Sequence, residues 1–101
     1  MPYKEKTILG FIDRFTQKGT DKEVIRVFTQ GCCYWFARIL LDRFPMGHIV
    51  YDPVENHFAC RISGQIYDIT GIVANPERFV LWETYPDPIE RRRIVRDCID
   101  F

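Results

Sequence analysis

The sequence has no surplus charge of either sign and no long apolar run. Lys and Arg together number 14, as do Asp and Glu, so the formal net charge is zero. A neutral balance removes the usual basis for broad nucleic-acid binding, so we expect no nucleic-acid partner. No stretch has the apolar length that a membrane span needs, and the polar residues 1–6 lack the apolar region of a signal peptide. We therefore expect no membrane partner.

Histidine and cysteine are both scarce, with two and four copies. Two of the cysteines, Cys32 and Cys33, are adjacent, and with Cys60 and Cys98 they do not have the spacing of a secreted disulfide framework. We interpret all four as reduced thiols of a cytoplasmic protein. Adjacent cysteines do not splay like a C-x-x-C pair, and His57 and Cys60 would lie on opposite faces of a strand. A zinc site is therefore disfavoured, and we expect no cofactor.

The chain has enough apolar side chain for one core, since 47% of its 101 residues are hydrophobic. We expect a single domain over residues 1–101. Helical spacing of apolar residues predicts helices at 4–17 and 33–44, a short helix capped by Thr20, and a last helix that is capped by Asp87 and begins with Pro88. The helix at 33–44 is apolar nearly all round, which is typical of a buried central helix.

The middle of the chain alternates as strands do. The pattern predicts strands at 48–52, 56–62 and 65–70, with a weaker one at 79–82. Helices, then an antiparallel meander, then a helix make an α+β plan. We therefore expect N-terminal helices, a buried central helix packed on a small antiparallel sheet, and a C-terminal helix.

Cys33 is the candidate nucleophile, because it opens the buried helix. The unpaired N–H groups and the dipole at a helix start favour a thiolate over a thiol. Gly31 allows a tight turn, so that backbone N–H groups can approach a substrate oxygen. The candidates for oxyanion contacts and for support of the site are Gln30, Gly31 and Thr70.

The predicted hairpin supplies the other two candidate catalytic residues. With a two-residue turn at 63–64, His57, Asp68 and Thr70 share one face of the hairpin. Asp68 can then hold one ring nitrogen of His57 while the other faces Cys33, as in a nucleophile–base–orienter triad. A turn one residue longer or shorter would move Asp68 to the opposite face.

Each of these residues also has a structural explanation. A cysteine at a buried helix start is more often a small core residue than a nucleophile. A strand histidine is usually a satisfied polar group, and Asp68 before Thr70 and Gly71 fits simple turn chemistry. The sequence leaves the catalytic and the structural interpretation both open.

Two short motifs resemble known families. The run from Cys33 to Ala37, Cys-Tyr-Trp-Phe-Ala, resembles the papain-like nucleophile that opens a central helix. The His57 strand and the strand ending in Asp68-Ile69-Thr70 resemble the transglutaminase-like pattern. The resemblance implies a papain-like minimal core and a Cys-His-Asp hydrolase or acyl transferase that acts on an amide or thioester. The span from Cys33 to His57 is short for a protease, and Gln30 lies nearer to the nucleophile than the papain-like oxyanion Gln does.

The whole chain also resembles small proteins of phages and mobile elements. This resemblance implies the alternative function, a non-enzymatic binding protein such as an anti-CRISPR-type inhibitor of a host defence enzyme. Under either interpretation the partner is a protein or a peptide. The candidate partner-binding residues lie on the basic face of the last helix, at Arg91, Arg92, Arg93 and Arg96.

Overall fold

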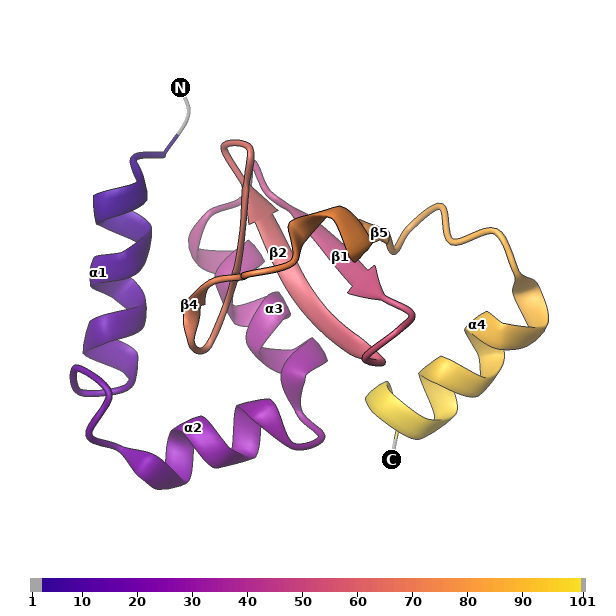
Figure 1. Ribbon diagram of the computed structural model, residues 1–101, viewed down its shortest axis with the longest axis horizontal. Coiled ribbons are helices and arrows are strands. Elements are labelled where there is room, and N and C mark those ends of the chain that lie inside the picture. The colour runs from indigo at the N-terminus through magenta and orange to yellow at the C-terminus, as the bar shows by residue number, and fades with distance from the viewer. Residues whose placement is uncertain (1–2, 101) are drawn as a thin grey trace.

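The computed structural model describes residues 3–100 as helices packed on a five-stranded antiparallel sheet (Figure 1). The predicted α+β class is therefore confirmed. Three helices precede the sheet, and a fourth follows it and continues into a π-helical turn. Their bounds are α1 Glu5–Phe15, α2 Lys22–Thr29, α3 Cys33–Arg43, α4 Pro88–Ile94 and η2 Val95–Ile99.

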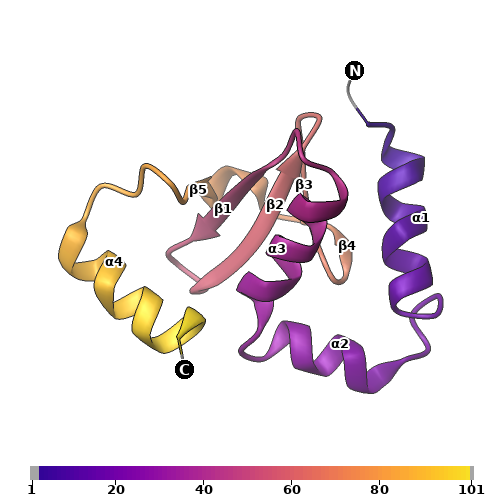
Figure 2. The same ribbon diagram turned by 180° about the vertical axis from the view of Figure 1, so that it is seen from behind.

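The sheet has the strand order β4-β3-β2-β1-β5, so β2 is its central strand. Helix α3 lies across one face, and the segment that contains β5 crosses toward the other (Figures 1 and 2). The strands are β1 His48–Asp52, β2 His57–Ile62, β3 Gln65–Asp68, β4 Gly71–Ile72 and β5 Val80–Leu81; a short 3₁₀ helix, η1 Pro76–Arg78, precedes β5. Strand β4 was not expected from the sequence.

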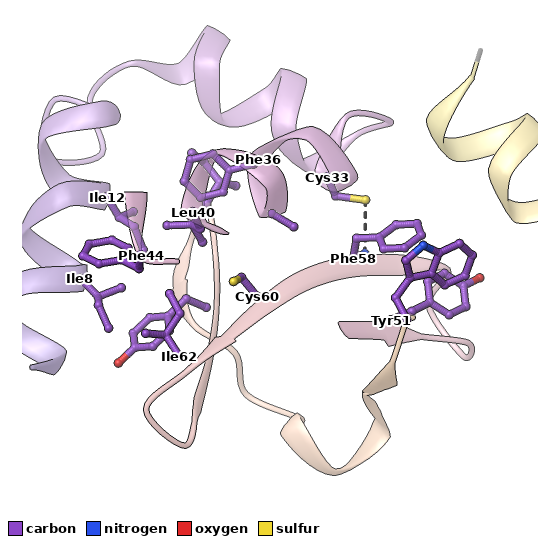
Figure 3. Packing of buried hydrophobic residues seen from close by; sticks show 14 of the residues in the cluster. Ile8, Ile12, Cys33, Phe36, Leu40, Phe44, Tyr51, Phe58, Cys60 and Ile62 are labelled. Carbon is purple, nitrogen blue, oxygen red and sulfur yellow. Dashed lines mark hydrogen bonds between the residues drawn. The ribbon is translucent and has the colours of Figure 1, made fainter. Parts of the chain in front are cut away.

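The main core lies between α3 and β2 (Figure 3). Phe36 and Leu40 of α3 are buried against Phe58 and Ile62 of β2. Burying each such side chain contributes about 1.5–3 kcal/mol to stability. The predicted central helix is confirmed, but its burial is one-sided: Trp35 is 45% exposed, because only one face of α3 meets the sheet.

The β2–β3 hairpin has the expected two-residue turn. Ile62 pairs with Gln65, and Ser63 and Gly64 both have positive φ, 53° and 85°. Two positive φ values are the signature of a type I′ turn, whose twist matches that of the flanking strands. This register sets which side chains of β2 and β3 share a face.

The start of α2 differs from the expectation that Thr20 caps it. The cap is Asp21, whose Oδ1 accepts the N–H of Val24 at 3.2 Å. The Thr20 hydroxyl instead donates to the carbonyl of Gln17 at 2.7 Å, within the turn that follows α1. Thr and Asp can both cap a helix, but the Thr20 hydroxyl is already bonded within the preceding turn, so Asp21 is the cap. At α4, Asp87 caps the helix as expected.

Helices α2 and α3 meet at a sharp corner, where Gly31 has a φ of 120°. Within residues 3–100, no single helix is long and apolar enough to span a membrane, and α2 with α3 passes that test only as a pair bent by 105°. A φ near 120° is open to glycine and strained for other residues. The corner lets α3 begin at Cys33, at the end of the sheet where β2 starts.

Candidate functional site

The fold brings the three candidate catalytic residues from three elements to one end of the sheet. Cys33 is the first residue of α3, His57 the first of β2, and Asp68 the last of β3. Because β2 and β3 are antiparallel, the start of one lies beside the end of the other. The N-terminus of α3 lies over the same end, and the Phe58 N–H donates to Cys33 Sγ at 3.4 Å (Figure 3).

The sulfur can reach this backbone because β3 is shorter than β2. The pairing of β3 with β2 ends at Cys60 and Tyr67, so it does not reach the first residues of β2. The N–H of Phe58 donates to the Cys33 thiol in place of a strand carbonyl. Cys33 is 8% exposed, so its sulfur is nearly enclosed by the groups that contact it.

His57 and Asp68 form a partly buried hydrogen bond. His57 Nε2 lies 2.9 Å from Asp68 Oδ2, and the two side chains are 21% and 15% exposed. The other carboxylate oxygen, Oδ1, accepts the N–H of Thr70 at 2.8 Å and its hydroxyl at 2.5 Å. Burial would raise the pKa of Asp68, but these bonds to His57 and Thr70 lower it. Thr70 therefore supports Asp68, while Asp68 orients the ring.

The Cys33 thiol and the His57 ring shift each other's pKa. Burial would raise the pKa of Cys33, but the nearby His57 side chain and the N–H groups of Phe58 and Tyr34 lower it below the ordinary 9.0. Burial would lower the pKa of His57, but its hydrogen bond with Asp68 and the nearby Cys33 thiol raise it to about 10. These opposite shifts both favour the charged forms, a thiolate at Cys33 and an imidazolium at His57.

Two other cysteines differ from Cys33 in this respect. Cys60 is fully buried, and burial raises its pKa to about 12. Cys98 is 8% exposed, like Cys33, yet its pKa is raised, first by burial and also by the negative charge of Cys33. All four cysteines are free thiols in the structure. Among these three buried thiols, only Cys33 is set up to ionise easily.

Of the residues expected to contact an oxyanion or support the site, Gln30 and Gly31 lie at the α2–α3 corner, and Thr70 lies between β3 and β4. Gln30 follows α2 and is exposed. Within residues 3–100 its side chain makes no hydrogen bond to Cys33, His57 or Asp68, so its oxyanion role stays a prediction. Gly31 supplies the turn. The N–H of Cys33, in the first position of α3, has no carbonyl one turn earlier in the helix to bond.

The basic face of the last helix is largely engaged within the fold. Arg93 forms ion pairs with Glu90 and Asp97, and Arg96 Nε lies 3.0 Å from Asp97 Oδ1. Arg91 stacks on the Trp82 ring and donates a hydrogen bond to the Trp82 carbonyl. The helix therefore offers less free positive charge than its sequence indicates, and partner binding through it, including by the exposed Arg92, stays a prediction.

Sequence reasoning missed a polar network that leads to the start of β2. Asn56 accepts a hydrogen bond from the Tyr51 hydroxyl and donates to Cys98 Sγ at 3.3 Å. Burial raises the pKa of Tyr51 to about 12, which keeps its hydroxyl protonated as a donor. Asn56 has a φ of 53°, a conformation that Asn tolerates better than most residues. The network ties the turn before His57 to the C-terminal helix.

A second missed residue is Asp52, which is 1% exposed and lies directly opposite His57 on β1. Its Oδ1 accepts the N–H of Val54 at 2.9 Å, and its Oδ2 lies 3.1 Å from Arg78 Nε. Asp52 thus holds the β1–β2 turn. Its place at the end of a strand before Pro53 was the available signal for such a turn.

Comparison with known proteins gives one match. A family model described as phage YunG-like protein matches residues 8–93, which include Cys33, His57 and Asp68. Searches of the curated proteins and of the solved structures found no match. The family match agrees with the resemblance to small phage proteins. Since it covers most of the chain, this protein belongs to the phage YunG-like protein family.

Proposed function

We propose that this protein is a cysteine hydrolase or acyl transferase acting on an amide or thioester. Cys33 is the nucleophile, His57 the general acid and base, and Asp68 the residue that orients His57. One observation carries the proposal: the His57 ring bonds Asp68 Oδ2 through Nε2 at 2.9 Å and interacts with the Cys33 thiol as well. The resemblance to papain-like and transglutaminase-like motifs supports the same three roles.

The first half of the reaction forms a thioester. The Cys33 thiolate attacks the carbonyl carbon, and the electron pair of the C=O bond moves onto oxygen. The N–H of Cys33 at the start of α3 is the candidate donor to that oxyanion. When the tetrahedral intermediate collapses, the bond to the leaving group breaks and the His57 imidazolium gives that group its proton.

The second half regenerates the enzyme. Neutral His57 takes a proton from water, or from an acceptor amine or thiol, which attacks the thioester carbonyl. The carbon–sulfur bond then breaks and Cys33 leaves as the thiolate, with His57 again protonated. Water as the acceptor gives hydrolysis, and any other nucleophile gives acyl transfer. Asp68 stabilises the imidazolium in both halves.

An acyl-trapping experiment tests the proposal without knowledge of the substrate. With p-nitrophenyl acetate we expect a burst of one nitrophenolate per chain, and an acetyl group on Cys33 in the peptide map. Cys33→Ala should abolish the burst. Cys32→Ala is the matched control, because Cys32 is the neighbouring thiol and caps α3 without a side-chain bond; it should keep the burst. A burst that survives Cys33→Ala would contradict the proposal.

A non-enzymatic function is the second candidate, and the match to a phage family favours it. On this view the protein binds and inhibits a host defence enzyme, as anti-CRISPR proteins do. The 8% exposure of Cys33 also suits a residue whose contacts are structural. Expression in a host with active CRISPR immunity tests this candidate: phage plaques should increase, and Cys33→Ala should act as well as the parent. Absence of any effect on plaques would count against it.

A further inference from the structure

A cavity of about 310 Å³ lies between α3, the start of β1 and the residues that follow β5. It does not include Cys33, but one of its lining residues is Tyr34, the next residue in α3. Tyr34, Arg38 and Leu41 lie along one side of the helix and form one wall. Trp82, which follows β5, and Arg91 of α4 form the opposite side.

Two guanidinium groups from different elements line this cavity. Arg91 is held in place, because its Nη1 donates to the Trp82 carbonyl and its guanidinium carbon lies 4.3 Å from the centroid of the Trp82 ring. That bond uses one of five donors. Arg38 makes only a long contact with Asp42, at 3.9 Å. Both arginines therefore keep N–H groups for a ligand.

The lining carries more positive than negative charge, although the whole chain is neutral. Its one acidic side chain is Glu83, and a Glu83 oxygen lies 3.4 Å from His48 Nδ1. Guanidinium groups recognise carboxylates and phosphates through paired, planar N–H donors. The Trp82 ring is only 7% exposed and lies against the Arg91 guanidinium, so it fixes the position of the Arg91 donors at the cavity.

We propose that this cavity binds an anionic group, a carboxylate or a phosphate, between Arg38 and Arg91. The inference goes beyond the proposed function, since it needs no chemistry at Cys33. Because Tyr34 lines the cavity and follows Cys33, a ligand anchored here lies beside the candidate active site. An anionic group would then be the feature by which the protein selects its substrate or partner.

Fluorescence of Trp82 tests the site, in a Trp35→Phe background that removes the other tryptophan. The probes are inorganic phosphate, succinate and the neutral succinamide, at constant ionic strength. We expect a saturable change with an anion and none with succinamide. The anion that binds more tightly identifies the source of the charge: phosphate indicates a phosphorylated ligand, and succinate a carboxylate.

Three variants give the direction of the effect. Arg38→Gln should weaken binding about tenfold, the typical effect of losing a charge-assisted hydrogen bond. Glu83→Gln should tighten binding several-fold, because it removes the opposing charge. Arg26→Gln makes the same charge change on the exposed face of α2, outside the cavity, and should alter the affinity less than about twofold.

Several results would overturn the inference: no saturable response to either anion, an equal response to succinamide, or equal weakening by Arg38→Gln and Arg26→Gln. If Arg38→Gln does not fold, Glu83→Gln decides, and unchanged or weaker binding counts against the site. The same titration on the Cys33→Ala protein separates this inference from the proposed function. Anion binding there should match the parent even though acylation is lost.

Discussion

The two oxygens of Asp68 have different partners: Oδ2 lies 2.9 Å from His57 Nε2, and Oδ1 accepts both the N–H and the hydroxyl of Thr70. Thr70 thus holds the carboxylate in a plane that aims Oδ2 at the ring. With Nε2 engaged, Nδ1 is the nitrogen left for the Cys33 thiol. The side chains thus lie in the order orienting residue, base and nucleophile that nucleophilic catalysis needs. Each of them can be tested by its own substitution.

Asp68→Asn should lower the pKa of His57 and slow acylation of Cys33. The amide cannot balance the imidazolium charge, whereas the Thr70 contacts can still hold the side chain in place. The pKa of His57, followed by NMR of its ring protons, should fall from about 10 toward the unperturbed range near 6.5. Asp42→Asn is the control, because that residue is exposed and lies at the opposite end of α3 from Cys33. An unchanged His57 titration would show that Asp68 does not act through the ring.

Alkylation of Cys33 by iodoacetamide should have its midpoint below pH 9.0, the ordinary pKa of the thiol. The thiolate is the reactive form, so a lowered pKa moves the reactive range toward lower pH. His57→Ala should move the midpoint upward by removing the charge that favours the thiolate. Mass spectrometry of each peptide provides the internal control, since Cys60, with a pKa near 12, should stay unlabelled in the folded protein. Equal labelling of both cysteines would contradict a specific thiolate.

The His57–Asp68 pair should stabilise the fold most at mildly acidic pH. A Cys33→Ala background isolates this pair from the thiolate. His57 has a raised pKa, so its contribution to stability is full below about pH 6.5 and declines as pH rises through the folded value. Asp68 has a lowered pKa, so its contribution is lost as pH falls below 3.8. Urea melts from pH 4 to 10 should show that the protein with His57 is more stable than its His57→Gln variant, and that this difference in unfolding free energy narrows toward alkaline pH. A difference that widens there would refute the raised pKa of His57.

The sequence predicted where Cys33, His57 and Asp68 lie in the fold, because their placement depends on local rules. Alternation along β2 and β3, with a two-residue turn, placed His57 and Asp68 on one face, and the apolar stripe of α3 placed Cys33 against the sheet. The Asn56–Cys98 bond joins residues 42 apart in sequence, and no local pattern pairs them. The cap of α2 was misplaced by one residue, since Thr20 and Asp21 are both good caps and only the preceding turn distinguishes them. The ion pairs of Arg93 and Arg96 could not be predicted either, because they depend on the side-chain conformations that the folded helix adopts.

Replacing Gly47 or Gly10 with alanine should change the stability of the fold in opposite directions. A Cβ at Gly47 would lie 2.9 Å from the carbonyl oxygen of Arg61 and 3.1 Å from Cys60 Sγ. Backbone cannot yield as a side chain can, so Gly47→Ala should destabilise by about 1–3 kcal/mol. At Gly10, within α1, the nearest atom is the Arg14 guanidinium at 3.6 Å. Gly10→Ala should stabilise by up to ~1 kcal/mol. Urea melts of both variants measure the change in unfolding free energy. Equal changes would contradict the close approach of Gly47 to β2.

Substitutions at the candidate catalytic residues should show whether these residues serve activity or stability. If the site is catalytic, Cys33→Ala abolishes acylation while the lost thiol costs on the order of 1 kcal/mol of stability. His57→Ala then slows the reaction by about 10²–10⁴-fold. If the residues are structural, their order of importance changes. His57→Ala then lowers the melting temperature, because it strands the Asp68 carboxylate at a cost of ~1–3 kcal/mol, and function tolerates Cys33→Ala. Thermal melts run beside the acylation and plaque assays distinguish the two cases, and full function in Cys33→Ala would exclude catalysis by this thiol.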